Sequence, residues 1–367
     1  MAEGTVAVSG PMECQLATLV ASVVEPDPAW AERAWQRLDG LTKPPRSLGR
    51  LEQLVVQMAA AQQTITPHAD PSAIVLCAGD HGVVAEGVSA WPSDVTRQMV
   101  ANFVAEGAAI NQLAGSVGAR LILMDVGVDG DTSGLPGVLQ MKVRPGTRNL
   151  AVEDAMTREE AAEAMLAGAR TAQQLASDGV RVIGIGEMGI GNSTVASALV
   201  AAFTNVPVNR VIGRGTGVDD KTLLHKTSVV NQALHRRRIY KHDPLDTLAS
   251  LGGLEIAAMA GVLIGGAAAG VCVVTDGFIS ASAALAAITM CPACLPYIFA
   301  SHLSVEPGHR VALVALGLEP YIELEMRLGE GTGAALGIGI MHAACAMMNG
   351  MATFAEAGVS GPGEEPA

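Results

Sequence analysis

Six short apolar runs, each ending in a loop that contains glycine or aspartate, constrain the fold of this chain more than any other feature. Each run is rich in Val, Ile or Leu and has the length of one buried strand. The runs are AIVLCAGDHG from Ala73, RLILMDVGVDG from Arg120, VRVIGIGEMG from Val180, NRVIGRGTG from Asn209, VCVVTDGF from Val271 and RVALVALGLEP from Arg310. We therefore predict six strands in a mostly parallel sheet.

Segments with helical periodicity separate these predicted strands. Apolar residues recur at spacings of three and four in Asp94 to Leu113, Arg158 to Ala176 and Ser193 to Phe203. Strands that alternate with helices are typical of a doubly wound α/β domain, in which ligands bind at the carboxyl ends of the strands. The six loops are all predicted to lie on that edge.

Charge and hydropathy exclude several classes of function. With 23 basic and 36 acidic residues, the net charge of -13 would repel a phosphate backbone, so we predict no nucleic-acid partner. The uncharged run from Ile256 to Thr275 contains four glycines and ends in VCVVTDG, which favours a buried helix followed by a buried strand over a membrane span. No basic segment precedes the first apolar stretch, so we predict a cytoplasmic protein.

The loop VIGIGEMGIGNST from Val182 partly satisfies two nucleotide-binding patterns. Gly184, Gly186 and Gly189 fit the dinucleotide pattern G-x-G-x-x-G, and Gly186 to Ser193 fits the P-loop frame except that Asn192 replaces its lysine. The dinucleotide interpretation also requires an acidic residue after the next predicted strand, which ends at Arg214 instead. Glycines before a helix N-terminus suit a single phosphate monoester, and a turn without a ligand is the alternative.

Other motifs suggest partners for this loop. GRGTG from Gly213 repeats the glycine-rich design, and Lys226 follows it as a possible phosphate ligand or a surface lysine. Glu330 lies between glycines in LGEGTG, where poor solvation would make it a stronger base than usual, although such a residue is more often a surface one.

Three further patterns give weaker predictions. Cys291 and Cys294 form a C-x-x-C pair, but their spacing to histidine is too short for a zinc finger, so we predict no metal. Asp125 alone occupies a position where pyrophosphate-dependent transferases need adjacent acids. Asp80 and His81 form a possible acid/base pair, although two adjacent side chains in a loop need not point in the same direction.

Several long motifs in order resemble one family, the nicotinate-nucleotide:dimethylbenzimidazole phosphoribosyltransferases of cobalamin lower-ligand synthesis. They are LTKPPRSLGRLE from Leu41, AGDHGVVAEGVSAWPSDVTRQMV from Ala78, GEMGIGNSTVASAL from Gly186, GRGTGVDD from Gly213, LGGLEIAAMAG from Leu251, TDGFISASAAL from Thr275, SHLSVEPGH from Ser301 and MRLGEGTGAAL from Met326. The resemblance implies a homodimer with a Rossmann-like domain at 65–332. A small helical domain would come from 1–64 and 333–356, and we expect a disordered tail at 357–367.

The resemblance also implies roles for particular residues. Glu330 would be the general base, and Glu187 would lie near it. The substrate-binding set is Pro92, Gln98, Met188, Gly189, Gly191, Asn192, Ser193, Thr194, Gly215, Lys226, Ser304 and Leu328. The implied reaction moves the phosphoribosyl group of nicotinate mononucleotide to dimethylbenzimidazole without a cofactor. An NAD-linked dehydrogenase and a non-enzymatic nucleotide sensor are the alternatives.

Overall fold

The sheet of this protein is six-stranded and entirely parallel in the computed structural model, which describes residues 10–215, 217–236 and 243–360. The strand order is β3-β2-β1-β4-β5-β6. The strands are β1 (Ser72–Gly79), β2 (Arg120–Gly127), β3 (Val138–Gln140), β4 (Val182–Met188), β5 (Cys272–Thr275) and β6 (Ile298–Ala300). This is the order of the doubly wound dinucleotide-binding folds, as the sequence predicts.

Two of the six predicted strands are wrong. The run from Asn209 forms the short helix α8 (Val208–Val211), and the run from Arg310 forms helix α13 (Pro307–Leu316). Their places at the two edges of the sheet are taken by β3 and β6, which pair with β2 and β5. The single helix predicted from Asp94 to Leu113 is two helices, α4 (Asp94–Val104) and α5 (Ala109–Ser116).

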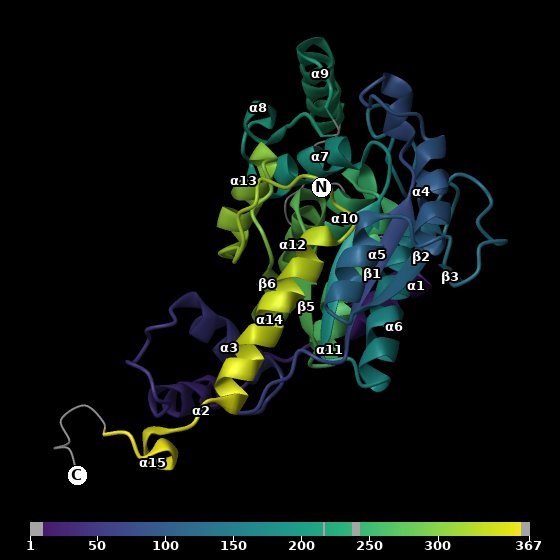
Figure 1. The fold of residues 1–367 in the computed structure, drawn as a ribbon. Coiled ribbons are helices and arrows are strands. Elements are labelled where there is room, and N and C mark those ends of the chain that lie inside the picture. The colour runs from purple at the N-terminus through teal and green to yellow at the C-terminus, as the bar shows by residue number, and fades with distance from the viewer. Residues whose placement is uncertain (1–9, 216, 237–242, 361–367) are drawn as a thin grey trace, which may run out of the picture.

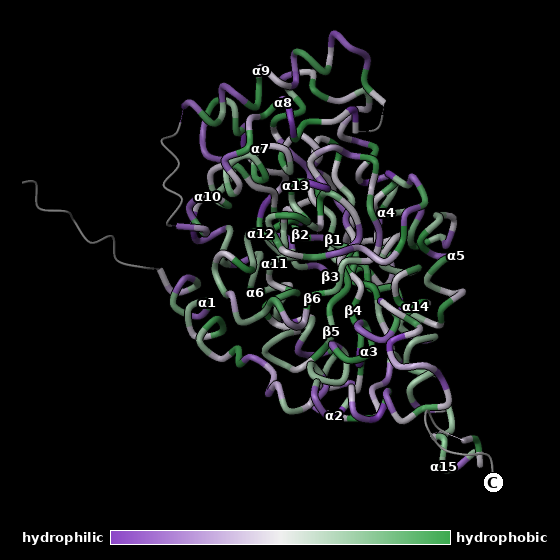
Figure 2. Tube along the Cα trace, turned by 90° about the vertical axis from the view of Figure 1, so that its left-hand side faces the viewer, coloured by the Kyte–Doolittle hydropathy of each residue, from purple (hydrophilic) through white to green (hydrophobic). Residues whose placement is uncertain are grey.

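Helices cover both faces of the sheet (Figures 1 and 2). Helices α6 (Arg158–Ser177) and α11 (Leu254–Ala268) pack together on one face. Helix α14 (Thr332–Gly350) crosses the other face, against β1, β4 and β5. The most hydrophobic segments gather around the strands in Figure 2, so the core lies on either side of the sheet.

The remaining helices pack around this central unit. They are α1 (Pro11–Ser22), α2 (Pro28–Asp39), α3 (Arg50–Ala61), α7 (Asn192–Thr204), α9 (Asp220–Arg236), α10 (Pro244–Leu251), α12 (Phe278–Met290) and α15 (Phe354–Ala357), with 3-10 helices at Gly82–Glu86 and Pro292–Tyr297. In Figure 1, α7 and α9 lie at the end of the molecule opposite to α2 and α3.

Residues from both chain ends lie side by side. Helix α3 packs on α14, and Leu41 pairs with Thr353 in an isolated antiparallel bridge. Helix α1, in contrast, packs on α6 and α11 beside the sheet. The division into a small and a large domain stays a prediction. Of the predicted disordered tail, residues 361–367 lie outside the described part of the chain.

Helix α14 is long and apolar enough to cross a membrane by composition alone, and half of its most apolar window is buried inside the protein. A core helix of a water-soluble protein has the same properties. Because α14 packs on three strands, its hydrophobicity is explained by the core.

Candidate active site

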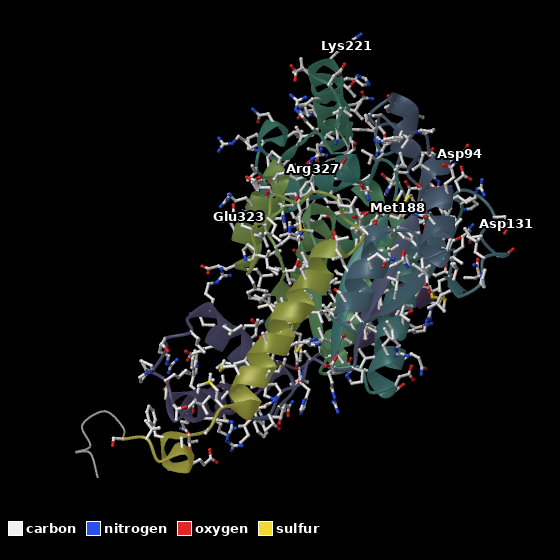
Figure 3. The ribbon with its side chains drawn as sticks, in the orientation of Figure 1. Asp94, Asp131, Met188, Lys221, Glu323 and Arg327 are labelled. Atoms are coloured by element: carbon white, nitrogen blue, oxygen red, sulfur yellow. The ribbon has the colours of Figure 1, made fainter. Side chains whose placement is uncertain are left out.

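A pocket of about 460 Å³ opens at the carboxyl ends of the strands. It lies where the strand order reverses between β1 and β4, which is where ligands bind in doubly wound folds. In Figure 3, Met188 and Arg327 mark this end of the molecule. The lining residues are Trp91, Val95, Met99, Glu187, Met188, Gly189, Ile190, Asn192, Ser193, Gly215, Gly277, Phe278, Ile279, His302, Ser304, Glu306, Arg327, Leu328, Gly329 and Glu330.

Glu187 stands at the end of β4 and is buried on the pocket wall. Its carboxyl oxygen Oε2 accepts a hydrogen bond from the side-chain amide of Asn192. Burial raises the pKa of Glu187 well above its ordinary value, and the nearby carboxylates of Asp276, Glu255 and Glu330 raise it further. The protonated form of Glu187 is thereby favoured, and in that form the carboxyl group can donate a hydrogen bond.

Glu330 is the second carboxyl group of the pocket, and its backbone is unusual. It has a φ of 64° and lies between Gly329 and Gly331, whose φ angles of 87° and 84° are also left-handed. Such a conformation is costly for a residue with a side chain and is held only where its surroundings enforce it. Burial, followed by the charge of Asp276, raises the pKa of Glu330 to about 7, which suits a general base.

Asp276 fixes the loop that carries Glu330. Its two carboxylate oxygens accept hydrogen bonds from the backbone N–H groups of Gly331, at 3.1 Å, and Gly333, at 2.6 Å. These N–H groups belong to the first turn of α14, where a negative charge is favourable. Gly186 of β4 packs directly under the loop, since a Cβ there would lie 2.4 Å from the nitrogen of Gly331.

The opposite side of the pocket presents polar groups suited to an anion. Ser193 lies in the first turn of α7, where backbone N–H groups are unpaired within the helix. Lys226 of α9 donates from Nζ to the hydroxyl of Ser193 at 2.9 Å and to the carbonyl of Gly213 at 3.2 Å. The carboxylate of Glu306 accepts from the N–H of Gly215 at 3.0 Å. We call Ser193, Gly213 to Gly215, Lys226 and Glu306 the phosphate cradle.

Lys226 is almost completely buried, with 1% of its side chain exposed. Burial lowers the pKa of its ammonium group to about 8, and the negative charge of Glu306 opposes that fall. At neutral pH the lysine is still mainly charged. A buried cation with one proton left after its two hydrogen bonds can bind an anion strongly.

The remaining wall is apolar and suits a flat aromatic ring. Val95 and Met99 of α4 line the pocket together with Trp91, Met188, Phe278 and Leu328. Trp91 and Leu328 are 52% and 57% exposed, which is unusual for such large apolar side chains. Their exposure at a concave site indicates contact with an apolar ligand.

Most of the predicted site residues meet in this pocket. Those on its wall are Glu187, Met188, Gly189, Asn192, Ser193, Gly215, Ser304, Leu328 and Glu330. Gly191 and Lys226 line a smaller adjoining cavity of about 30 Å³, and Thr194 is buried in α7. Pro92 and Gln98 are exposed beside the pocket, and α4 presents Val95 and Met99 to it instead.

Sequence reasoning missed several residues of the site. Asp276, His302, Glu306 and Arg327 lie in the quoted motifs, yet nothing in their spacing separates them from structural residues. Phe278 was also overlooked. Periodicity identifies a buried helix face but does not tell which end of it faces a pocket.

The weaker motifs lie elsewhere. Asp80 accepts from Thr96 and the N–H of Asp129, while His81 lies 2.9 Å from Glu255 in a buried pair, so the two neighbours face different partners. Asp125, near the end of β2, accepts hydrogen bonds from the backbone N–H of Val128 and from the hydroxyl of Thr132. Within the described ranges, no group of three or more metal-ligating side chains comes together, and Cys291 and Cys294 are buried without a disulfide.

The pocket therefore combines two buried carboxyl groups with raised pKa values and an apolar wall, and it adjoins a buried lysine held by glycine-rich loops. This set of groups fits a transferase of phosphorylated groups. Comparison with known proteins agrees with this class. The profile of the family described as "DBI_PRT: Phosphoribosyltransferase" matches residues 23–359. The chain belongs to the nicotinate-nucleotide–dimethylbenzimidazole phosphoribosyltransferase family and is an enzyme of the phosphoribosyltransferase class.

Relatives named nicotinate-nucleotide–dimethylbenzimidazole phosphoribosyltransferase align along almost the whole chain. The protein from Desulforamulus reducens is 49% identical over 346 residues, 94% of this chain and 99% of the relative. That from Geobacter metallireducens is also 49% identical, over 94% of this chain and 98% of the relative. The crystal structure of CobT from Thermus thermophilus is 48% identical, with a TM-score of 0.88, and covers 91% of this chain and 100% of its own.

Proposed function

We propose that this enzyme transfers the phosphoribosyl group of nicotinate mononucleotide to 5,6-dimethylbenzimidazole or a related base. The products would be nicotinate and α-ribazole 5′-phosphate, used in the assembly of the cobalamin nucleotide loop. The relatives' names support these substrates. One observation carries the proposal: Glu330, with a pKa of about 7, lines a pocket with the apolar wall and with Ser193, Gly215 and Glu306 of the phosphate cradle, whose Lys226 lines an adjoining cavity.

The proposed chemistry needs one base and no metal. In nicotinate mononucleotide the ring nitrogen is a positively charged pyridinium, so its departure with the bonding electrons neutralises that charge without a general acid. Glu330 removes the N–H proton of the benzimidazole, and the other ring nitrogen attacks C1′. Attack from the face opposite nicotinate inverts the β-glycoside to the α-glycoside.

The other residues bind and orient the substrates. Lys226 and Ser193 hold the phosphate at the N-terminus of α7, and Met188, Leu328 and Phe278 enclose the base. Glu187, whose raised pKa favours the protonated form, donates a hydrogen bond to a ribose hydroxyl or to the base. Pro92 and Gln98 are exposed beside the pocket, so they would reach the base only if the loop at Pro92 and helix α4 moved inward. Fixing both substrates in one pocket replaces a collision in solution by a positioned attack.

We also propose a cytoplasmic homodimer without a nucleic-acid or membrane partner. Val305, Val314 and Leu324 are exposed near the pockets, and a second copy would cover them. Light scattering on the purified protein should give twice the chain mass of 37.5 kDa. A monomer at micromolar concentration would contradict this part of the proposal.

A substrate panel tests the reaction itself. Nicotinate mononucleotide and NAD are each incubated with the enzyme, with and without dimethylbenzimidazole, and the products are separated by chromatography. We expect nicotinate and a ribazole phosphate only when the mononucleotide and the base are both present. Hydride transfer from a reduced nicotinamide would favour the dehydrogenase alternative instead. Replacing the base by adenine or phenols then defines the acceptor range.

A further inference from the structure

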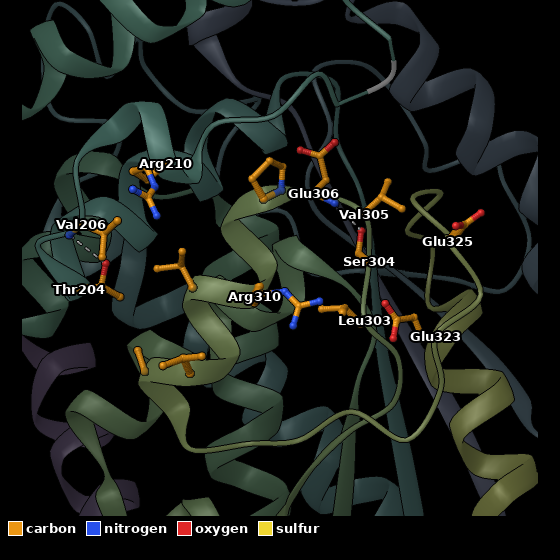
Figure 4. A pocket seen from close by; sticks show the side chains of 14 residues that line it. Thr204, Val206, Arg210, Leu303, Ser304, Val305, Glu306, Arg310, Glu323 and Glu325 are labelled. Carbon is orange, nitrogen blue, oxygen red and sulfur yellow. Dashed lines mark hydrogen bonds between the residues drawn. The ribbon is translucent and has the colours of Figure 1, made fainter.

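Glu306 raises a question, because a buried carboxylate in a phosphate cradle should repel the ligand. Glu306 is 9% exposed and lines two cavities at once. One is the pocket described above, and the other is an adjoining cavity of about 710 Å³ (Figure 4). Glu306 and Ser304 belong to the wall between them. A carboxylate in this wall would repel a bound phosphate, so a favourable interaction of Glu306 must offset this repulsion.

The geometry shows that Glu306 and Lys226 grip the same short backbone segment. Lys226 donates to the carbonyl of Gly213, while Glu306 accepts from the N–H of Gly215. Arg327 donates to the carbonyl of Gly215 at 3.0 Å. The three side chains thus hold the Gly213 to Gly215 segment from separate elements. Lys226 comes from α9, Glu306 from the loop before α13 and Arg327 from the loop before α14.

Glu306 is also the acidic group that acts on Lys226. The acids at the start of α9 are engaged elsewhere, since Asp220 pairs with Arg214 and Asp219 accepts from the N–H of Thr222. Helix α7 contributes only the hydroxyl of Ser193 to the lysine. Burial favours the neutral amine, and the carboxylate of Glu306 favours the ammonium form.

We propose that Glu306 is a positioning residue of the phosphate cradle, which holds the Gly213 to Gly215 segment and keeps Lys226 in its protonated, phosphate-binding form. This inference rests on the proposed function, because it assumes that the cradle binds the phosphate of nicotinate mononucleotide. The carboxylate of Glu306 repels the phosphate at short range, but it also keeps Lys226 in the charged form that binds the phosphate. The balance between the two effects changes with pH.

The test compares the affinity of Glu306→Gln and the unmodified enzyme for nicotinate mononucleotide at pH 6 and pH 8, by calorimetry without the second substrate. The amide keeps the shape but removes the charge, so Lys226 should lose its proton at a lower pH. Each unit of that fall weakens binding at high pH about tenfold. At pH 8, a fall of one unit from about 8 lowers the protonated fraction of Lys226 from about one half to about a tenth, so we expect about fivefold weaker binding there and nearly normal binding at pH 6.

Three controls assign this effect to the pair. Nicotinate riboside, which lacks the phosphate, should bind both proteins with the same ratio at both pH values. In a Lys226→Met background, Glu306→Gln should add no pH-dependent loss. Glu323→Gln removes an equal charge from an exposed residue of the adjoining cavity and should leave the affinity unchanged (Figure 4).

Other outcomes would overturn the inference. Weakening by the same factor at both pH values would mean that Glu306 only braces the loop, and tighter binding at both would mean that it only repels. If the unmodified enzyme did not bind the mononucleotide, the proposed function would fail instead. NMR titration of ¹³C-labelled lysine would then still test the effect of Glu306 on Lys226. The inference requires a lower pKa for Lys226 in Glu306→Gln than in the unmodified enzyme.

Discussion

Exchange of Glu330 for glutamine removes the proposed base with the least change in shape. The amide keeps the length of the side chain but cannot accept the proton of the benzimidazole. General-base catalysis contributes about 10² to 10⁴ in rate, so kcat should fall by that factor while the KM for the nucleotide changes little. Circular dichroism should confirm that the fold is retained.

The raised pKa of Glu330 sets the pH dependence of the same reaction. With a pKa of about 7, the side chain is the active carboxylate in about half of the molecules at pH 7 and in about a tenth at pH 6. The logarithm of kcat/KM should therefore rise with pH up to about 7 and fall again above about 8, where Lys226 loses its proton. Glu330→Gln should lose this rise.

Stability should change with pH in the opposite direction. The folded-state pKa of Glu330 lies above its ordinary value, so its contribution to stability is present at acid pH and is lost as the pH rises through about 7. The glutamine variant has no such loss, and its melting temperature relative to the unmodified enzyme should be higher at pH 8 than at pH 5.

Glu187→Gln is the matched control for this reasoning. The raised pKa of Glu187 favours its protonated form, which an amide that donates a hydrogen bond replaces closely, so kcat should fall far less than in Glu330→Gln. If Glu187→Gln abolished turnover while Glu330→Gln retained it, the base would be Glu187. If both variants stayed active, positioning alone would drive the transfer.

Three other changes test the rest of the site. Lys226→Met should weaken binding of the mononucleotide by about 1.5 to 3 kcal/mol, the value of a charged hydrogen bond, and equal activity on nicotinate riboside would argue against a phosphate ligand. Gly186→Ala should lower kcat, because its Cβ would lie 2.4 Å from the nitrogen of Gly331 and would displace the Glu330 loop; normal kcat would show that the loop tolerates movement. Turnover should survive EDTA, whereas loss of activity with bound zinc would restore Cys291 and Cys294 as ligands.

The central strands were predictable from sequence, and the edges were not. β1, β2, β4 and β5 coincide with long apolar runs, since strands buried on both faces need them. β3 and β6 have three residues each, too few for any pattern. The run from Arg310 has the apolar content of a strand, but Pro307 at the first turn and Gly317 with a φ of 67° are helix start and stop signals that should have outweighed it.

The candidate site divides in a similar way. Glycine loops and Glu330 could be found because unusual backbone requires recognisable residues. Asp276 and Glu306 could not, since both act through backbone N–H groups of loops that are distant in sequence. Such contacts depend on the tertiary fold and leave no mark in local spacing.

The left-handed backbone at Glu330 gives a way to recognise members of this family that have changed their role. Glycine or asparagine adopts that conformation at less cost, so selection for stability alone would remove the glutamate. The proposed role of Glu330 as the base accounts for a glutamate at this position despite that cost. Consider a relative that keeps Asp276 and the flanking glycines but carries glycine at the position of Glu330. Such a protein would have kept the fold of the site and lost the base, and we expect it to bind ligands without catalysing the transfer.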